Sequence, residues 1–331
     1  MSDEEFIELK LDDLIQVLTR PLGIFVERGL GVTTKFWANE ENENLPLALS
    51  TREKRKFGNQ LLDKILGLPA EEAGAFDIEG WFDEAERAGQ LPVGFYGAGS
   101  VLDMKEKVRS IEKLFREHGF DAVLPLRTIE IDVPFRIDGQ LVGHVVDVVP
   151  GVLVKDSEAC CEIHAYNEKY SGEWPWNEER LQVRLHALLA AGIPVSRGEC
   201  FYLNKNSTGD KGWAKCGIVE LAPTVDRRLA TERIELLASL YVEAQRNPYP
   251  MFGNTWSLLD VDRNEARAKF VEFCRNDGEY DRYSESPEYR VYGAVPDFDE
   301  IFPEGGVVAT FFGSLKSFGS LSGPKEKRIH S

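Results

Sequence analysis

Residues 141–166, LVGHVVDVVPGVLVKDSEACCEIHAY, decide the fold. Together with TIEIDVPFRIDGQ at 128–140, they alternate apolar and polar side chains with a period of two, which is typical of strands that bury one face. Between two such runs, Asp138-Gly139 is a strong hairpin-turn signal. We therefore expect two antiparallel strands joined at this turn, followed by a third strand at ACCEIHAY, residues 159–166.

The segments that follow carry helix and strand signals in turn. NEERLQVRLHALLAAG, at 177–192, predicts a helix with Asn177 as its N-cap and Gly192 as its C-terminal glycine. GECFYLN at 198–204 and GWAKCGIVELA at 212–222 predict two more strands. The order strand, strand, strand, helix, strand, strand indicates an α/β fold, with a central mixed sheet flanked by helices.

The remainder of the chain is mostly helical in pattern. Leu11, Leu14, Ile15 and Leu18 share one face of a helix that breaks before Pro21. Further helices are expected at 22–30, 50–67, 81–90, 100–119, 226–245 and 264–274, with a glycine-rich loop at 91–99. We expect three parts in one compact domain: a helical part at 1–125, the α/β core at 126–225, and C-terminal helices and loops at 226–331.

The composition is that of a globular protein. The chain has 331 residues, of which 43% are hydrophobic, and it has no low-complexity tract. No run reaches about 18 apolar residues, and the N-terminal MSDEEFIELK is acidic, so we expect neither a membrane span nor a secretory signal. The five cysteines show no C-x-x-C spacing, which favours buried free thiols in a reducing cytoplasm over a zinc site or a disulfide framework.

The net charge of -17 argues against a broad nucleic-acid surface, since phosphate binding needs local Lys and Arg. Basic residues do cluster at 52–56, along 105–113 and at 325–328. Each cluster fits a solvated helix face or tail at least as well as a phosphate track. The candidate DNA contacts are Arg52, Lys54, Arg55 and Lys56.

Two acids and a histidine of the opening stretch fit the core of a metal-dependent nuclease. Asp147 and Glu162 lie on neighbouring expected strands, and carboxylates that converge on Mg²⁺ would activate water and stabilise charge on a scissile phosphate. Such a core carries a lysine two residues after the second acid, on the same strand face, and here His164 takes that place. With an ordinary pKa of about 6.5, His164 would be mostly neutral at pH 7 unless nearby carboxylates raise that pKa.

An alternative interpretation gives these residues structural roles. Asp147 would cap a strand end, Glu162 would form a surface ion pair, and His164 would be satisfied by hydrogen bonds. Gln182 is a further candidate, because it precedes His186 by four residues on one helix face. Nucleases of the RecB type carry a Gln-x-x-x-Tyr pair at this point, and His186 departs from that pattern.

Several blocks of the chain, in order, resemble one family. They are LDDLIQVLTRPLGIFVERGLGV, LPLALSTREKRKFGNQLLDKIL, GQLPVGFYG, LVGHVVDVVPG, ERLQVRLHALLAAG, LASLYVEAQRNPYPMFGNTW and NEARAKFVEFCRNDGEYDRYSESPEYRVYG. Together they cover nearly all of the chain, and the combination resembles the C-terminal domain of the gamma subunit of exodeoxyribonuclease V, the RecC family. More distantly, the chain resembles the RecB-like PD-(D/E)xK nuclease fold.

The resemblance implies a nuclease-like fold without nuclease activity, which guides DNA ends and docks onto RecB-like and RecD-like subunits in double-strand break repair and recombination. No cofactor is expected in that role, and His164 agrees with it, whereas the retained Asp147 and Glu162 depart from it. Family members are several times longer, with helicase-like domains before this region. Because Met1 stands almost where the resemblance begins, we expect a split subunit, a phage or mobile-element relative, a truncated product or a designed fragment.

Two other functions stay open. The chain could be an active Mg²⁺-dependent DNA nuclease, with Asp147 and Glu162 as metal ligands, His164 in the lysine's role and Gln182 orienting the strand. It could also be a mobile-element mimic of RecC that binds the host helicase–nuclease, which its acidity would suit. No G-x-x-x-x-G-K-[ST] motif is present, so we do not expect an ATP-driven motor.

Overall fold

A computed structural model gives the fold. It describes residues 6–32, 51–89, 95–120, 126–155, 158–166, 178–203, 214–249, 262–274 and 297–301, with residue 304 and residues 309–311 and 313–314. In this part of the chain, no helix is both long enough and apolar enough to cross a membrane.

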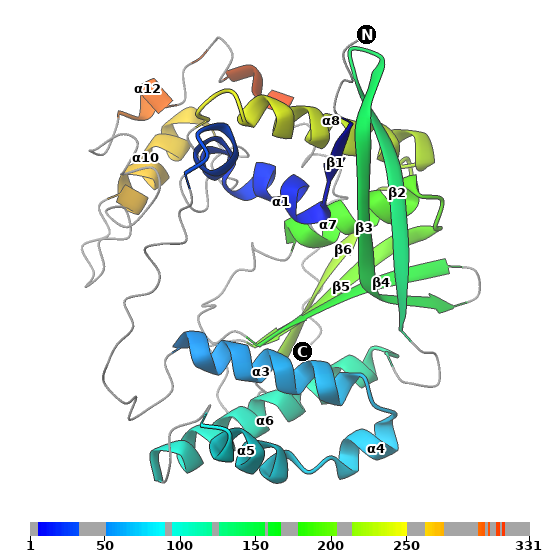
Figure 1. Cartoon of the computed structure of the whole chain (residues 1–331), viewed down its shortest axis with the longest axis vertical. Coiled ribbons are helices and arrows are strands. Elements are labelled where there is room, and N and C mark those ends of the chain that lie inside the picture. The colour runs from blue at the N-terminus through cyan, green and yellow to red at the C-terminus, as the bar shows by residue number, and fades with distance from the viewer. Residues whose placement is uncertain are drawn as a thin grey trace.

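Six strands form one mixed sheet (Figure 1). The strands are β1 (Ile7–Leu9), β2 (Arg127–Ile137), β3 (Gln140–Lys155), β4 (Glu158–Ala165), β5 (Val195–Leu203) and β6 (Ala214–Glu220). Their order is β1-β3-β4-β5-β6, with β2 paired to β3. The pairs β1–β3 and β4–β5 are parallel and the others are antiparallel, so the predicted α/β class and mixed sheet are confirmed.

The predicted hairpin joins β2 to β3. Asp138 and Gly139 have φ angles of 52° and 79°, the positive values that a two-residue hairpin turn requires. From this turn β2 pairs along one edge of β3 as far as Val152. β1 and β4 therefore share the opposite edge of β3, where β1 pairs with residues 143–145 and β4 with residues 152–155.

One helical layer covers the first face of the sheet. It contains α1 (Leu11–Thr19), α2 (Pro21–Ile24), the π-helical turn η1 (Phe25–Gly29), α7 (Glu178–Ala190) and α8 (Arg227–Ala244). Its apolar residues form the first core with strand residues such as Val145, Val149, Cys161 and Cys200. The Asp226 carboxylate caps α8 by accepting the amide of Leu229, as the predicted helix start requires.

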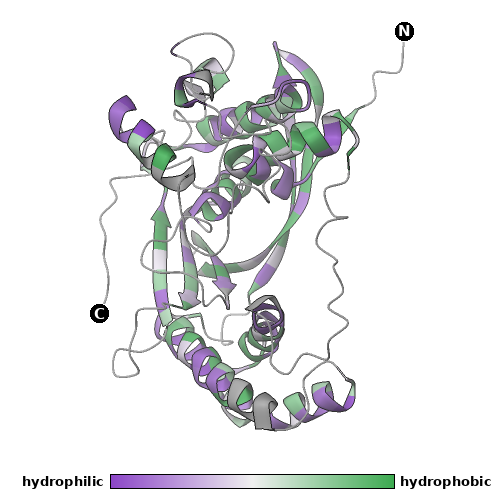
Figure 2. Cartoon of the chain, turned by 90° about the vertical axis from the view of Figure 1, so that its left-hand side faces the viewer, coloured by the Kyte–Doolittle hydropathy of each residue, from purple (hydrophilic) through white to green (hydrophobic). Residues whose placement is uncertain are grey.

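A second helical layer covers the other face. It contains α3 (Thr51–Leu66), α4 (Ala70–Ala75), α5 (Ile78–Arg87) and α6 (Phe95–Glu117). These helices form the second core with Leu153, Tyr166, Phe201 and Leu203 of the sheet region. Figure 2 shows the two helical layers apart from one another, with strands running between them. Two further helices, α10 (Arg263–Cys274) and α12 (Phe298–Ile301), lie together near the first layer (Figure 1).

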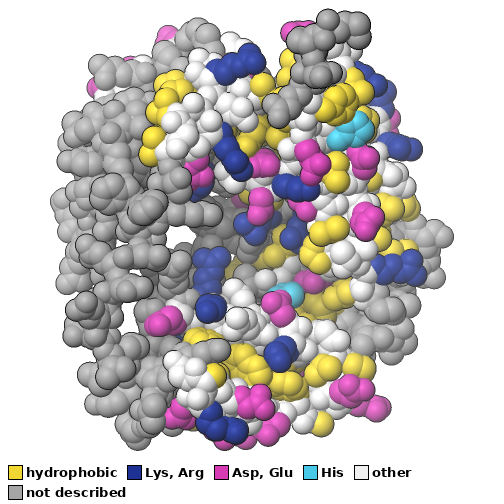
Figure 3. Space-filling view, in the orientation of Figure 1, with side chains coloured by type: hydrophobic (Ala, Val, Ile, Leu, Met, Phe, Trp, Pro, Cys, Tyr) yellow, Lys and Arg dark blue, Asp and Glu magenta, His cyan; other side chains and the backbone are white. Residues whose placement is uncertain are grey.

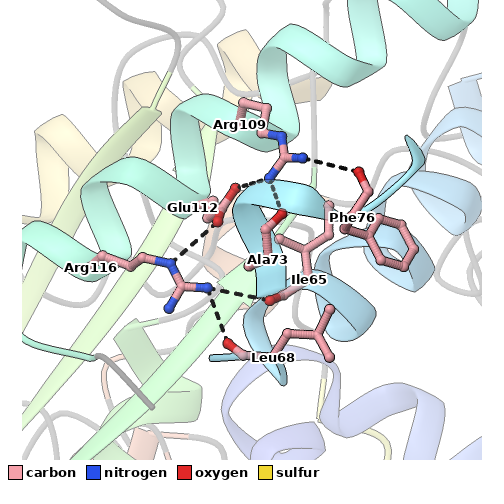
Figure 4. A network of polar contacts seen from close by, with 7 residues as sticks. All are labelled: Ile65, Leu68, Ala73, Phe76, Arg109, Glu112 and Arg116. Atoms are coloured by element: carbon pink, nitrogen blue, oxygen red, sulfur yellow. Dashed lines mark hydrogen bonds and ion pairs between the residues drawn. The ribbon is translucent and has the colours of Figure 1, made fainter. Parts of the chain in front are cut away.

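An ionic network inside the second layer joins three of its helices (Figure 4). Arg109 of α6 donates to the carbonyls of Ala73 and Phe76 at the end of α4. Arg116 donates to the carbonyls of Ile65 and Leu68 at the end of α3, and Glu112 binds both guanidinium groups. These carbonyls lie at the ends of α3 and α4, beyond the regular helical hydrogen bonds, so the two guanidinium groups add acceptor partners at two helix ends at once. The expectation of a solvated face along 105–113 is therefore wrong for Arg109.

Three local predictions differ from the structure. Residues 7–9 form β1 rather than part of a helix, because they pair with residues 143–145 of β3. α6 begins at Phe95 rather than at Ser100, although the glycines in this first turn weaken a helix. The later turns hold the helix in place, because they bury Met104, Val108, Ile111 and Phe115. Helix α4 was not expected at all. The predicted N-cap Asn177, and Ser50, the first residue of the helix expected at 50–67, lie outside the described residues.

Four of the cysteines lie in the described core region as free thiols. Cys161 and Cys200 are buried, and Cys160 and Cys216 are half-buried. This confirms the expectation of free rather than disulfide-bonded cysteines for these four positions.

A β-bulge interrupts β3 at Pro150-Gly151. Ile129 of β2 pairs with Val149 and Arg127 pairs with Val152, so β3 advances three residues while β2 advances two. Gly151 adopts a φ of 74°, a conformation that favours glycine. Because of the extra residue, Val149 and Val152 both join the first core, and Leu153 joins the second. The bulge thus reverses which residues of β3 face each layer.

Candidate functional site

Asp147 lies on β3 and belongs to the first face of the sheet. Residues two apart in a strand point to the same face, and Val145 and Val149, two residues before and after Asp147, are both in the first core. The Asp147 carboxylate accepts a hydrogen bond of 2.9 Å from the amide of Leu11, which is the first residue of α1. It also accepts one of 2.8 Å from the amide of Val148. A carboxylate at a helix N-terminus satisfies a free amide and interacts favourably with the helix dipole. Asp147 therefore anchors α1 to β3.

Glu162 lies on β4 and belongs to the second face. The residues on either side of it, Cys161 and Ile163, pack with the first core, whereas Cys160 packs with the second. Glu162 is only 5% exposed. Its Oε1 lies so close to Gly151 that a Cβ atom there would be 2.4 Å away. The alternative expectation of a surface ion pair is therefore wrong for Glu162, because the residue is buried.

Asp147 and Glu162 do not fit one Mg²⁺ ion. Their side chains point to opposite faces of the sheet. The Glu162 carboxylate lies beside Gly151 of β3, which is four residues along the strand from Asp147. At a rise of about 3.3 Å per residue, these four residues span about 13 Å of strand. Two carboxylates that share a Mg²⁺ ion each lie about 2.1 Å from it. The sequence-predicted ligand pair is therefore not brought together.

His164 links the sheet to the second helical layer. Its Nδ1 lies 3.1 Å from Oε2 of Glu162, and its Nε2 lies 2.7 Å from Oδ1 of Asp63 in α3. Burial alone would lower the pKa of His164, but the hydrogen bonds and negative charges of these carboxylates outweigh it and raise the pKa to about 9. His164 is therefore a cation at pH 7, which sequence reasoning allowed only if neighbouring carboxylates raised its pKa.

Two partners in this region were missed by sequence reasoning. Asp63 stands 101 residues before His164 in another element, and no local pattern connects them. Glu199 of β5 is the register partner of Glu162 on the parallel strand β4 and is also buried. Buried carboxylates on adjacent strands need positive partners, and His164 supplies one of them.

Gln182 and His186 lie on the first face, in α7. Both are buried, at 4% and 2% exposure, and they share one face of the helix as predicted. His186 Nδ1 donates to the carbonyl of Gln182 at 2.7 Å. Burial, with a contribution from the charge of Arg233, lowers the pKa of His186 to about 4 against the opposing effect of that hydrogen bond. This neutral pair is separated by the sheet from Glu162 and His164.

The candidate DNA contacts lie in the first turns of α3. Arg55 and Lys56 are exposed and Lys54 is half-buried, whereas the structure does not describe the side chain of Arg52. Lys56 Nζ lies 5.9 Å from the centre of the Phe57 ring. Figure 3 shows Lys and Arg side chains around a central hollow on one face, with Asp and Glu among them.

A family model described as the RecC C-terminal domain matches residues 7–259. The chain belongs to this family. The match extends from β1 to beyond α8 and thus includes all six strands and both helical layers of the RecC-type domain. No curated protein matches the chain.

The polar residues of this RecC-type domain divide between the two faces of its sheet. Asp147 holds α1 on the first face. His164 holds Glu162 and Asp63 together on the second face. These three acids stabilise contacts between elements, and each is engaged by a partner within the chain.

Proposed function

We propose that this RecC-type domain is a non-catalytic unit that guides DNA ends and docks onto RecB-like and RecD-like subunits of a cytoplasmic helicase–nuclease. Family membership supports a role in a RecBCD-like complex, in double-strand break repair and recombination. The observation that carries the non-catalytic part is the placement of Asp147 and Glu162 on opposite faces of the sheet, each engaged in an internal contact.

We also propose that the fold derives from a PD-(D/E)xK nuclease. The mixed sheet with helices on both faces supports this origin, as does the spacing of Glu162 and His164 on β4. On this proposal, the bulge at Pro150-Gly151 and the substitution of lysine by histidine accompanied the loss of a common metal site. The division into parts at 1–125, 126–225 and 226–331 is likewise a proposal. The pairing of β1 with β3 supports one compact domain.

DNA contacts of the domain are proposed at the start of α3. Arg52, Lys54, Arg55 and Lys56 lie within two turns of one helix, and exposed basic side chains with this spacing suit a few phosphate contacts. With a net charge of -17, most of the remaining surface would face solvent or protein partners rather than DNA.

Two observations favour other functions. The charged state of His164 supplies the positive charge that an Mg²⁺-dependent nuclease would need beside Glu162. The strong acidity would suit a mimic that binds basic surfaces of a host helicase–nuclease. Both remain alternatives to the docking role.

A reconstitution experiment tests the docking role. The purified chain is mixed with purified RecB-type and RecD-type subunits, and complex formation is followed by size-exclusion chromatography. Co-elution together with support of DNA unwinding agrees with the proposal. Co-elution with an intact host helicase–nuclease that loses activity would favour the mimic. A chain that binds neither subunit would contradict the docking role.

A further inference from the structure

Three side chains with metal-binding atoms converge where the second helical layer meets the sheet. They are His118, just after α6, Glu199 on β5 and Cys216 on β6, and their ligand atoms all lie within 4.8 Å of one another. Glu199 Oε2 lies 2.6 Å from Nδ1 of His118 and 3.5 Å from Sγ of Cys216. One carboxylate oxygen is thus shared between a nitrogen and a sulfur donor.

The fold holds each of these side chains in place. His118 continues the last turn of α6 by donating its amide to the carbonyl of Leu114, and Gly119 ends the helix with a φ of 86°. The His118 ring stands edge-on to Phe201, with 5.4 Å between ring centres. Because Glu199 lies two residues before Phe201 and Cys216 pairs with Phe201, all three strand residues face the second layer.

We propose that His118, Glu199 and Cys216 form a three-ligand site for a zinc ion. Nitrogen, carboxylate oxygen and thiolate sulfur are the ligands that Zn²⁺ takes in proteins, and a thiolate disfavours Mg²⁺ and Ca²⁺. This site differs from the Mg²⁺ site considered at Asp147 and Glu162 in its residues and in its metal. It links α6 to β5 and β6, so the ion would fasten the second helical layer to the sheet.

The charges around the cluster suit a divalent cation. The Glu199 carboxylate and a Cys216 thiolate would together neutralise the charge of Zn²⁺, with His118 neutral. Arg197 binds the other Glu199 oxygen, Oε1, at 2.7 Å, which leaves Oε2 for the metal and orients the carboxylate. The charge of Arg197 is itself opposed by Glu220 at 3.9 Å.

The thiolate rather than the thiol is the zinc ligand, so zinc binding would break the S–H bond of Cys216, form a Zn–S bond and release one proton to solvent.

The distances require only a small adjustment. Tetrahedral ligands at ordinary Zn–S and Zn–O lengths lie roughly 3.5 Å apart, close to the observed 3.5 Å between Cys216 and Glu199. For a Zn–N and a Zn–O bond the corresponding spacing is about 3.3 Å, so His118 Nδ1, now 2.6 Å from Glu199 Oε2, would have to move away by about 0.7 Å. The His118 side chain is 17% exposed, so solvent can reach the cluster and water would complete the coordination.

Zinc titration of the full, chelator-treated chain tests the site. Calorimetry should detect one Zn²⁺ ion per chain, and the melting temperature should rise with zinc. Cys216→Ser and His118→Gln should each weaken binding at least about tenfold. Cys160→Ser is the matched control, because Cys160 is another half-buried thiol of the sheet that lies outside the cluster, and it should bind zinc as the wild type does.

Cobalt substitution gives a readout in the wild-type chain itself. Co²⁺ in the wild-type chain should show a thiolate-to-cobalt charge-transfer absorption, which Cys216→Ser abolishes and Cys160→Ser retains. Absence of this absorption in the wild type would overturn the proposal. Zinc binding that is equally strong in Cys216→Ser and His118→Gln would overturn it as well, since the ion would then lie elsewhere.

Discussion

Asp147 and Glu162 point to opposite faces of the same sheet, and the bulge at Pro150-Gly151 between their positions is the reason. Without the extra residue, the alternation of side chains along β3 would continue unbroken into the segment that pairs with β4. Asp147 instead serves the start of α1, and Glu162 serves His164. The acids that looked like one metal site are two separate structural contacts.

Removal of His164 should destabilise the domain. His164→Gln leaves the Glu162 carboxylate buried without its cation and breaks the link to Asp63. We expect a loss of about 2 to 3 kcal/mol in the free energy of unfolding, measured by urea denaturation, because an unpaired buried charge is costly. His144→Gln is the control: His144 pairs with Asp132 near the surface, and its loss should cost under about 1 kcal/mol. Equal effects of the two substitutions would contradict this role for His164.

Stability should depend on pH through His164. Its pKa is about 9 in the folded chain, above its ordinary value of 6.5, so its stabilising effect is fully present below pH 6.5 and is lost as the pH rises through 9. The effect is at most about 3 kcal/mol. Unfolding measured from pH 6 to pH 10 should therefore show the difference between wild type and His164→Gln shrinking. A difference that stays constant over this range would contradict a folded pKa of about 9 for His164.

His186 should make the folded chain less stable as the pH falls below 6.5. Its folded pKa of about 4 lies below the ordinary 6.5, so the folded chain resists its protonation. The stability that comes from neutral His186 is present above pH 6.5 and is lost as the pH falls towards 4. His186→Phe should reduce the steepness of acid unfolding over this range. An unchanged slope would contradict the lowered pKa.

Substitution of Gly151 should be costly for two reasons. In Gly151→Ala the residue must keep a φ of 74°, and its Cβ would lie 2.4 Å from Glu162 Oε1. We expect a loss of about 3 kcal/mol in urea unfolding. Gly139→Ala is the matched control, since Gly139 has a φ of 79° with nothing within 4 Å of a Cβ, and should cost about 1 kcal/mol. Similar losses at both positions would mean that the contact with Glu162 is unimportant.

The DNA contacts proposed on α3 can be tested with two lysines of the same helix. Lys56→Gln should weaken binding to DNA ends and reduce the slope of log affinity against log salt by about 1, the value for one lost phosphate contact. Lys64→Gln, also exposed but two turns later, should change neither quantity. If both variants behave as the wild type does, DNA does not contact this end of α3.

Much of the sheet was predictable because its signals are local. The alternation in β2 and β3, the Asp138-Gly139 turn and the helix expected at 226–245 each depend on signals within a few residues, and each is confirmed. β1 was missed because three residues form a strand only by pairing with β3, far along the chain. The orientation of the candidate site was missed for a different reason. The Pro150-Gly151 pair was a visible bulge signal, but only the pairing with β2 shows that one residue is added there.

The contacts of His164 were beyond sequence reasoning. Its charge depends on Asp63 in α3 and on the burial of Glu162, both of which follow from packing between layers. The same holds for His118, Glu199 and Cys216, which are separated by 81 and 17 residues and match no metal-binding spacing. Clusters assembled from different elements leave no pattern in the sequence.

A nuclease assay tests the central claim most directly. The purified chain, Asp147→Ala and Glu162→Ala are each incubated with linear duplex and single-stranded DNA in the presence of Mg²⁺ or Mn²⁺. The separation of the two acids predicts no metal-dependent cleavage by the wild type and no difference between it and either variant. Metal-dependent cleavage by the wild type that both substitutions abolish would contradict the non-catalytic role.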